Sequence, residues 1–584
     1  MNIIGISAHF HDAACCLLRD GHLVAAAQQE RFSRVKHDPS LPAHAFRFCL
    51  AEGGITIREV DAIAYYEMPI KKLSRQLWMG LPGALHSDQH LQRLDPGRAE
   101  REIRSGLGFE GRIEFVEHHL SHAASSFYFS GFPEAAILTM DGVGEWATTT
   151  YGKGAGADLE IFEEIGFPHS VGLLYSTITN YLGFQVNDGE YKVMGLAPYG
   201  NPCYVSQIQR MIRSGQGGQF KLDLSYFDFM QPDRMFSSEL PELLDGPPRV
   251  PESDLTQRHR DIARSLQVVF EEFLLAKVRY LHTRVPSANL AMAGGAALNC
   301  VANARILREG PFKRIFVPPA PNDSGGALGA AAIVNHRLSG EAVREPLNSA
   351  QLGPRYSSEE VQAILEDAGV NALDFRGREP ELLKATVQRL ASQQVVGWFQ
   401  GRMEFGPRAL GARSILADPR NSEMRNRINA MVKKRESFRP FAPAVLEEKA
   451  HLHFDLDHAS PFMLETCPVT SSLDLPAVTH VDRSARVQTV SAADNPRFSK
   501  LLAAFEAQTG CPVLLNTSFN LRGEPIVCTP ENALLRFLLS SIDVLVIEDF
   551  LVDRSGFPTA YDSLRNYYQK VGGGSGTTPV YPFF

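Results

Sequence analysis

The sequence lacks several features that would place it in a specialised class. Its eight cysteines are scattered and form no Cys-x-x-Cys pair, which argues against a zinc ribbon, a thioredoxin-like redox site and a disulfide framework. The start, "MNIIGISAHFHDAACC", has no basic segment followed by an apolar run, so we expect no signal peptide. The most apolar late stretch, "ALLRFLLSSIDVLVIEDFLV", is interrupted by charged residues, so we expect no membrane span and a cytoplasmic location.

A positive net charge is also missing. The formal charge of -8 argues against a nucleic-acid surface, although local basic patches can still bind small anions such as phosphates. A hydrophobic content of 44% and a charged content of 21% are typical of soluble globular proteins. At 584 residues the chain is too long for one ordinary core, so we expect two large domains or three smaller ones.

Two hairpins with polar turns lie in the first half of the sequence. "NIIGISA" and "AACCLLR" read as strands, and a turn at Asp20 and Gly21 leads into the strand "HLVAAAQQ". "AAILTMDGVGEWATTTYGKG" repeats this plan, with Asp141 and Gly142 at its bend. A later strand, "LAMAGGAALN", ends in glycines before the helical "CVANARILRE". The pattern predicts a duplicated architecture that holds a nucleotide.

A domain boundary is predicted near residue 350. Residues 335–360 lose periodicity and gather Pro, Gly and Ser, which gives domains 1–350 and 351–584. Beyond the boundary, "PELLKATVQRLASQQ" reads as a helix, "VVGWFQ" as a strand and "PRFSKLLAAFEAQTG" as an amphipathic helix. The last stretch, "VGGGSGTTPVYPFF", reads as a flexible linker. Both domains are therefore predicted to mix α and β structure.

The stretch "VEHHLSHAASSFY" carries the first candidate site. On a helix, His118 and His122 share one face, whereas His119 points elsewhere. Carboxylates at strand ends, such as Asp141 and Asp323, would complete a mixed nitrogen and oxygen set for divalent iron, manganese or zinc. An isolated pair of helix histidines is more often hydrogen-bonded beside a core. Both interpretations remain open at this point.

Three glycine-containing loops are weaker candidates for a ligand site. Gly325 in "PAPNDSGGALGAA" opens a helix, and Gly294 and Gly295 follow a strand in "MAGGAALNC". These glycines either let a nucleotide approach the main chain or only relieve crowding between strand and helix. "QVNDGEYKVMGLAPYG" reads either as a loop that places Lys192 over a polar ligand or as a solvated turn.

The second half is richer in cations that lie near Gly and Pro breaks. Guanidinium groups match phosphate oxygens in pairs, although a run of charge is more often a solvated surface. "VLLNTSFNLRGEPIV" adds short hydrogen-bond donors suited to phosphate or acyl oxygens, or else a capped turn. The cations are Arg402, Arg408, Arg413, Lys433, Lys434, Arg435 and Arg439.

The motifs "HFHDAA", "HHLSHAASSFY", "MDGVGEWA", "NDGEYKVMGLAPYG", "GGAALN", "PNDSGGALGA", "GPRALGARSILADPR", "FRPFAPAV" and "NTSFNLRGEPIV" occur in this order. Together they closely resemble the O-carbamoyltransferase family of antibiotic and nodulation-factor biosynthesis, over nearly the whole chain. The resemblance implies an N-terminal actin-like ATPase (ASKHA) domain of duplicated ribonuclease-H-like halves, similar to the tRNA threonylcarbamoyl-transfer protein. It implies a C-terminal YrdC-like α/β domain.

The resemblance also implies a division of chemistry between the domains. The C-terminal domain would combine ATP with carbamoyl phosphate to make carbamoyl adenylate, and the N-terminal domain would pass the carbamoyl group to a hydroxyl of a small molecule. Iron(II) is the implied metal, with magnesium as a further candidate. The implied metal ligands are His118, His122, Asp141 and Asp323. The implied catalytic residues are His11, Lys433 and Arg439. The implied anion and adenylate contacts are Arg408, Ser437, Arg486, Ser518, Asn520 and Arg522. The glycine-containing loops add Lys192, Gly294, Gly295, Asn299 and Gly325 as candidate cofactor contacts.

Two other functions compete with this one. A tRNA threonylcarbamoyl transferase shares the fold, but an acidic chain without a basic, aromatic-rich patch argues against it. A non-catalytic, actin-like nucleotide sensor would need neither the histidine pair nor the C-terminal cations. The sequence does not identify the acceptor molecule, and a homodimer fits an enzyme of this size.

Overall fold

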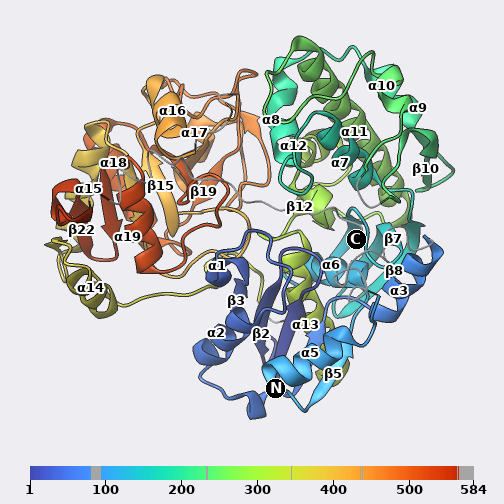
Figure 1. Ribbon diagram of the computed structural model, residues 1–584, viewed down its shortest axis with the longest axis horizontal. Helices are drawn as coiled ribbons and strands as arrows, with labels where there is room; N and C mark the ends of the chain where they lie inside the picture. Colours follow the sequence, from blue (N-terminus) through green and yellow to red (C-terminus); the bar gives the residue numbers. More distant parts are fainter. Residues whose placement is uncertain are drawn as a thin grey trace. The chain divides into compact units, whose positions relative to one another are not determined.

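The computed structural model describes residues 1–79, 94–231, 234–343, 345–433, 436, 438–561 and 563, without the side chains of residues 432 and 433. The chain divides into two compact units. The first unit contains Met1–Gln29 and His37–Leu347, and the second contains Glu30–Lys36 and the residues from Asn348 onward. Helices and strands alternate in both units, as predicted (Figure 1).

The first sheet of the first unit has the strand order β3-β2-β1-β4-β5. β1 pairs with β2 and β2 with β3 in antiparallel fashion, whereas β1, β4 and β5 run parallel. The predicted turn between β2 and β3 is present, because Asp20 and Gly21 both have positive φ (50° and 77°), as a two-residue type I′ hairpin requires. The strands are β1 (Asn2–Ser7), β2 (Ala14–Arg19), β3 (His22–Gln28), β4 (Ala62–Tyr65) and β5 (Arg112–Phe115).

The second sheet repeats this topology. Its strand order is β8-β7-β6-β11-β12. As in the first sheet, two antiparallel pairs are followed by two parallel pairs. A topology that occurs twice in succession is the signature of the predicted duplicated halves. The strands are β6 (Glu134–Met140), β7 (Ala147–Ala155), β8 (Asp158–Gly166), β11 (Asn289–Ala293) and β12 (Arg314–Phe316).

Helices follow the strands in the same positions in both halves. In the first half these helices are α2 (Ala43–Gly53), α3 (Pro69–Trp78), α5 (Arg98–Leu107) and α6 (His118–Phe127). In the second half they are α7 (Val171–Tyr181), α8 (Glu190–Leu196), α11 (Gln257–Arg284), α12 (Cys300–Glu309) and α13 (Asp323–Ser339). Each half thus ends with a helix that follows its fifth strand, α6 in the first half and α13 in the second.

Helices α6 and α13 pack against each other between the two sheets. α13 contacts β1, β2 and β4, whereas α6 contacts β6, β7 and β11 (Figure 1). Glycine permits the close approach, since a Cβ on Gly329 of α13 would lie 1.7 Å from the carbonyl oxygen of Ser121 on α6. A Cβ on Gly5 of β1 would similarly lie 2.0 Å from the carbonyl oxygen of Ala327. The starts of the two helices are therefore fixed in the centre of the unit.

The second unit is built on one mixed sheet with the order β13-β22-β21-β14-β15-β20-β16-β19. The strands are β13 (Leu373–Asp374), β14 (Val396–Phe399), β15 (Arg413–Ala417), β16 (Ala442–Leu446), β19 (Gln488–Val490), β20 (Val513–Ser518), β21 (Val544–Ile547) and β22 (Phe550–Asp553). The main helices are α14 (Ser358–Asp367), α15 (Glu379–Ala391), α16 (Glu423–Ile428), α18 (Pro496–Thr509) and α19 (Pro530–Leu539). The predicted strand "VVGWFQ" and both predicted helices are confirmed, and α18 ends at Gly510 with φ 73°.

A short early segment belongs to the second unit. Glu30–Lys36, which includes α1 (Glu30–Ser33), leaves the first unit after β3 and the chain returns to it at His37. Arg31 donates a hydrogen bond to the carbonyl of Gly406 (2.7 Å), and Arg34 donates to the carbonyls of Pro525 and Ile526 (2.7 and 2.6 Å). This exchange could not be predicted from the sequence, because a run of charged residues after a strand reads as an ordinary surface turn.

Two predictions about local structure were wrong. The stretch "NDGEYKVMG" was expected to form a loop, but α8 begins at Glu190. The aperiodic stretch was expected from residue 335, but α13 continues to Ser339, where Gly340 ends it in the left-handed conformation (φ 75°). The predicted C-terminal linker lies outside the described residues. Among the helices that the structure describes, none combines the length and apolar character needed to cross a bilayer.

Candidate functional site

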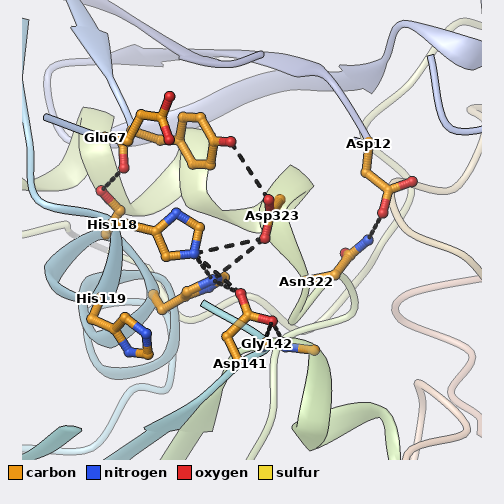
Figure 2. A network of polar contacts seen from close by, with 12 residues as sticks. Asp12, Glu67, His118, His119, Asp141, Gly142, Asn322 and Asp323 are labelled. Atoms are coloured by element: carbon orange, nitrogen blue, oxygen red, sulfur yellow. Dashed lines mark hydrogen bonds and ion pairs between the residues drawn. The ribbon is translucent and has the colours of Figure 1, made fainter. Parts of the chain in front are cut away.

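Four side chains of the first unit converge on one point (Figure 2). The Nε2 atoms of His118 and His122 lie 3.0 Å apart, and they lie 3.1 and 3.2 Å from Oδ2 of Asp141. Oδ1 of Asp323 lies 3.8 and 3.7 Å from the same two nitrogens. One ligand atom from each residue falls within 4.8 Å of all the others. The structure thus brings together the four residues for which the sequence suggested a metal.

Helix α6 presents the two histidines. His118 is its first residue and His122 follows one turn later on the same face, as predicted. The start of the helix is held by Glu145, whose carboxylate accepts hydrogen bonds from the backbone N–H of His118 (3.0 and 3.2 Å) and of Met68 (2.6 Å). His119 points away from the cluster, and its Nδ1 lies 2.6 Å from the hydroxyl of Thr139. The sequence did not reveal the role of Glu145.

Asp141 is oriented by the main chain around it. Its Oδ1 accepts hydrogen bonds from the backbone N–H of Gly142 (2.8 Å) and of Gly295 (3.3 Å), so that Oδ2 faces the histidines. Gly294 has φ 93°, and a Cβ there would lie 2.0 Å from the carbonyl oxygen of Met140. The Gly-Gly pair therefore has a packing reason: it lets the end of β11 lie directly against the end of β6 and the Asp141 carboxylate.

Asp323 is the first residue of α13 and is fully buried. The hydroxyl of Tyr66 donates a long hydrogen bond to its Oδ2 (3.5 Å), but its Oδ1 has no hydrogen-bond partner among the described residues. Gly325 packs where a Cβ would lie 1.9 Å from the carbonyl oxygen of Ala320, which fixes the turn before the helix. Oδ1 of Asp323 is thus a buried carboxylate oxygen that faces two ring nitrogens and lacks a hydrogen-bond donor in the part of the chain that the structure describes. A cation would satisfy such an oxygen.

The donor set fits a divalent transition metal. Two imidazole nitrogens and two carboxylate oxygens suit iron(II), manganese(II) or zinc(II). The Nδ1 atoms of His118 and His122 are also buried without a hydrogen-bond partner among the described residues. The tautomer of each ring is therefore not set by a hydrogen bond at Nδ1. A proton on each Nδ1 would leave both Nε2 lone pairs free for one ion.

The electrostatics of the cluster agree with a cation-binding site. Burial alone would raise the pKa of Asp141, but hydrogen bonds from His118 and His122 hold it well below its ordinary value. Burial opposes protonation of His122, yet the hydrogen bond to Asp141 and the negative charges of Asp141 and Asp323 raise its pKa to about 9. The protein charges alone thus favour positive charge at the centre of the cluster.

His11 lies beside this cluster, in the loop between β1 and β2. Its Nε2 is 4.0 Å from Oδ2 of Asp323, and its Nδ1 is 3.0 Å from Oδ2 of Asp12. Burial lowers the pKa of His11, but Asp323 and Asp12 raise it to about 9. No role was predicted for Asp12, although it follows His11 directly in the motif "HFHDAA".

One end of the sheet in the second unit gathers most of the predicted anion-binding residues. β20 ends at Ser518, opposite Ser414 at the start of β15, and Asn516 pairs with Ala442 at the start of β16. β19 runs parallel to β16, so it starts at the same end. The predicted residues on the segments that enter or leave the sheet here are Arg408, Arg439, Arg486, Ser518 and Asn520.

The loop that carries Arg408 is rigidly held. One oxygen of the Glu404 carboxylate accepts hydrogen bonds from the backbone N–H of Leu410, Ala412 and Arg413 (2.7, 2.7 and 3.2 Å). The side chain of Asn516 donates to the carbonyl of Ala409 (3.2 Å). Because three backbone N–H groups donate to one carboxylate, the loop is held in a single conformation. An anion-binding site needs such a preorganised loop.

Two arginines of the predicted cation set are structural instead. Arg413 is fully buried, its guanidinium carbon lies 3.6 Å from the centroid of the Phe399 ring, and it donates to four backbone carbonyls. Arg402 donates to the carbonyls of Leu352 and Gly353 (2.6 and 3.3 Å). The guanidinium group of Arg413 is therefore not accessible to a phosphate, and that of Arg402 binds the main chain; a spacing pattern does not reveal which guanidinium groups satisfy backbone carbonyls.

The remaining predicted residues lie in several places. Ser518 donates to Oδ1 of Asn520 (2.6 Å), and Arg522 follows in the same loop. Asn299 caps α12 through the N–H of Ala302 and exchanges hydrogen bonds with Gln267. The Lys192 ammonium lies 5.7 Å from the Phe184 ring. Lys434, Arg435, Ser437 and the side chain of Lys433 lie outside the described residues.

Comparison with known proteins identifies the family. The family model described as carbamoyltransferase N-terminus matches residues 2–80 and 102–332, and the model described as carbamoyltransferase C-terminus matches residues 387–554. The chain belongs to the carbamoyltransferase family. An uncharacterised protein of Synechocystis sp. is 46% identical to this carbamoyltransferase. The alignment covers 95% of this chain and 97% of the relative.

A named relative is similar over much of its length. Nodulation protein NolNO of Sinorhizobium fredii is 39% identical over 93% of this carbamoyltransferase and 79% of the relative. Among solved structures, HypF of T. kodakarensis is 13% identical, with a TM-score of 0.31 over 58% of this chain and 48% of that chain. Family membership rests on the sequence models and relatives, and the fold rests on the strand order described above.

Proposed function

We propose that this carbamoyltransferase makes carbamoyl adenylate from ATP and carbamoyl phosphate and transfers the carbamoyl group to a hydroxyl of a small molecule. The observation that carries the proposal is the buried cluster of two histidines and two aspartates beside His11, in a chain matched by both carbamoyltransferase models. The anion-binding end of the second unit supports the first reaction, and the cluster supports the second.

The first reaction places a phosphate and a nucleotide beside the cationic sheet end. Arg408 and Arg439, with Lys433 and the donors Ser518 and Asn520, would neutralise phosphate charge in two steps. Water releases phosphate from carbamoyl phosphate, and an oxygen of the resulting carbamate attacks the α-phosphorus of ATP, so that pyrophosphate leaves and carbamoyl adenylate remains. The carboxylate of Glu404 fixes the Arg408 loop before substrates bind. Binding energy from the nucleotide then orients the carbamoyl carbon for attack.

The second reaction needs a base near the hydroxyl acceptor. Asp12 accepts a hydrogen bond from Nδ1 of His11, so Nε2 of His11 is the atom that would take the hydroxyl proton. Asp323 would hold a cation and no longer lend its charge to His11, which favours the neutral imidazole that a base requires. When bound, iron(II) or a similar ion would supply Lewis-acid polarisation of the carbamoyl group or its leaving phosphate.

The test separates the two reactions. Purified protein is incubated with ATP, carbamoyl phosphate and iron(II), and carbamoyl adenylate and pyrophosphate are measured by mass spectrometry. We expect Arg408→Ala and Lys433→Ala to lower adenylate formation by about 10²-fold or more. We expect His122→Ala to form adenylate and fail in transfer. Arg378→Ala, at an exposed arginine of the second unit, is the matched control.

Folded, iron-replete protein that forms no carbamoyl adenylate would contradict the proposal. The nucleotide-sensor function would then account better for the chain, and ATP binding without turnover would be its positive sign. If His122→Ala left transfer intact, the cluster would have no part in the second reaction.

A further inference from the structure

The carboxylate of Asp12 collects donors from three separate segments of the first unit. Its Oδ2 lies 3.0 Å from Nδ1 of His11 and accepts a hydrogen bond from Nδ2 of Asn322 (2.7 Å). Its Oδ1 lies 2.7 Å from Nδ1 of His37. An ionised carboxylate only accepts hydrogen bonds, so both imidazoles donate from Nδ1. Asp12 therefore determines which nitrogen of His11 remains free.

The backbone around Asp12 is strained and tied to the His37 segment. His9, Asp12 and His37 all have positive φ (69°, 54° and 56°), which is unusual for residues other than glycine. The N–H of His9 donates to the carbonyl of Pro39 (2.7 Å), and the N–H of Ala13 donates to the carbonyl of Asp38 (3.1 Å). Such strain persists only where the surroundings hold it, and it concentrates at functional sites.

We infer that His37 is a positioning residue for carbamoyl transfer: by holding one oxygen of Asp12 it keeps the other on Nδ1 of His11, so that Nε2 of His11 faces the reacting hydroxyl. The inference rests on the proposed function and extends it to a residue that does not touch the substrate. In the transfer step the acceptor oxygen attacks the carbamoyl carbon and the bond from that carbon to the AMP oxygen breaks. AMP leaves with the electron pair, and the hydroxyl proton moves to Nε2 of His11.

The geometry explains why the two donors on Oδ2 of Asp12 are insufficient. A carboxylate held only on Oδ2 is free to rotate about its Cβ–Cγ bond and exchange its oxygens, whereas donors on both oxygens fix its plane. Asn322 precedes the cluster residue Asp323, and its own Oδ1 accepts a hydrogen bond from Ser324 (2.8 Å). His37 is the donor on Oδ1, and its Nε2 lies 3.9 Å from Asp188 on the other side. Loss of His37 should therefore release the Asp12 plane.

The test compares His37→Leu with His37→Asn. The Asn side chain carries an N–H donor close to the position of Nδ1, whereas Leu carries none. Crystal structures of both variants should show the hydrogen bond between His11 and Asp12 retained in His37→Asn and broken in His37→Leu. Bound iron, measured by elemental analysis, should stay at the wild-type level in both variants, because His37 lies outside the cluster of His118, His122, Asp141 and Asp323.

Kinetics give the second readout, with glycerol as the hydroxyl probe and hydroxylamine as a nucleophile that needs no base. Transfer to glycerol should fall about 10–100-fold in kcat in His37→Leu, with little change in KM, and recover in His37→Asn. Adenylate formation and transfer to hydroxylamine should change less than about twofold. A His37→Leu protein that keeps both the His11–Asp12 hydrogen bond and glycerol transfer would overturn the inference. Wild-type protein without adenylate formation would instead count against the proposed function.

Discussion

The two halves of the first unit share one topology but contribute different chemistry to the site. The loop between the first two strands carries His11 in the first half, and the corresponding loop of the second half carries Asp141. The helix after the fifth strand begins with His118 in the first half and with Asp323 in the second. Duplication thus brings equivalent positions together: the two histidines of the cluster come from one half and the two aspartates from the other, and neither half holds all four.

The largest expected effect comes from removing a ligand from either half. His118→Ala and Asp323→Ala should both abolish stoichiometric iron binding and lower carbamoyl transfer by about 10³-fold or more, because several kcal/mol of transition-state stabilisation are lost. Elemental analysis and a transfer assay measure the two effects. Glu117→Gln, at the exposed N-cap of α6, is the control. Full iron binding by either Ala variant would break the assignment of one ligand pair to each half.

The next effect concerns the contact that joins the halves. Gly329→Ala would place a Cβ 1.7 Å from the Ser121 carbonyl oxygen, so α6 and α13 must move apart. We expect the free energy of unfolding to fall by about 3 kcal/mol, measured by urea denaturation. Gly106→Ala in α5, where the Cβ meets only the end of Leu41 at 3.3 Å, should be neutral or slightly stabilising. Equal stability of the two variants would show that the helices are not in tight contact.

The smallest effect separates the third histidine from the ligands. His119 is buried next to His118, but its ring lies against Thr139. His119→Ala should retain iron and lower the free energy of unfolding by about 1–3 kcal/mol, because the buried Thr139 hydroxyl loses one of its two partners and keeps only Thr150. Calorimetry and elemental analysis measure the two quantities. Loss of iron in this variant would extend the ligand set beyond the four residues.

The sequence predicted the features that depend on neighbouring residues. The hairpin at Asp20 and Gly21 could be predicted because its turn needs two residues that tolerate positive φ, and Asp-Gly is such a pair. The shared face of His118 and His122 could be predicted from their spacing of four residues on a helix. The stop of α18 at Gly510 follows from the same preference of glycine for positive φ. Local patterns of this kind need no knowledge of the rest of the chain.

Features that depend on distant contacts could not be predicted in this way. Asp12 is held by His37 and Asn322, which are 25 and 310 residues away along the chain. Arg413 looks like a phosphate ligand by its spacing, yet it satisfies backbone carbonyls of the second unit as far away as Pro354. Only the folded arrangement reveals which polar groups are already satisfied and which, such as Oδ1 of Asp323, are left for a ligand.

The most direct test of the account is to locate the metal. Crystals of protein reconstituted with iron(II) are measured at the iron absorption edge, and the anomalous difference map is calculated. The account predicts one strong peak enclosed by Nε2 of His118, Nε2 of His122 and the carboxylates of Asp141 and Asp323. Iron-replete crystals with no peak there, and with those four side chains turned away from one another, would contradict it.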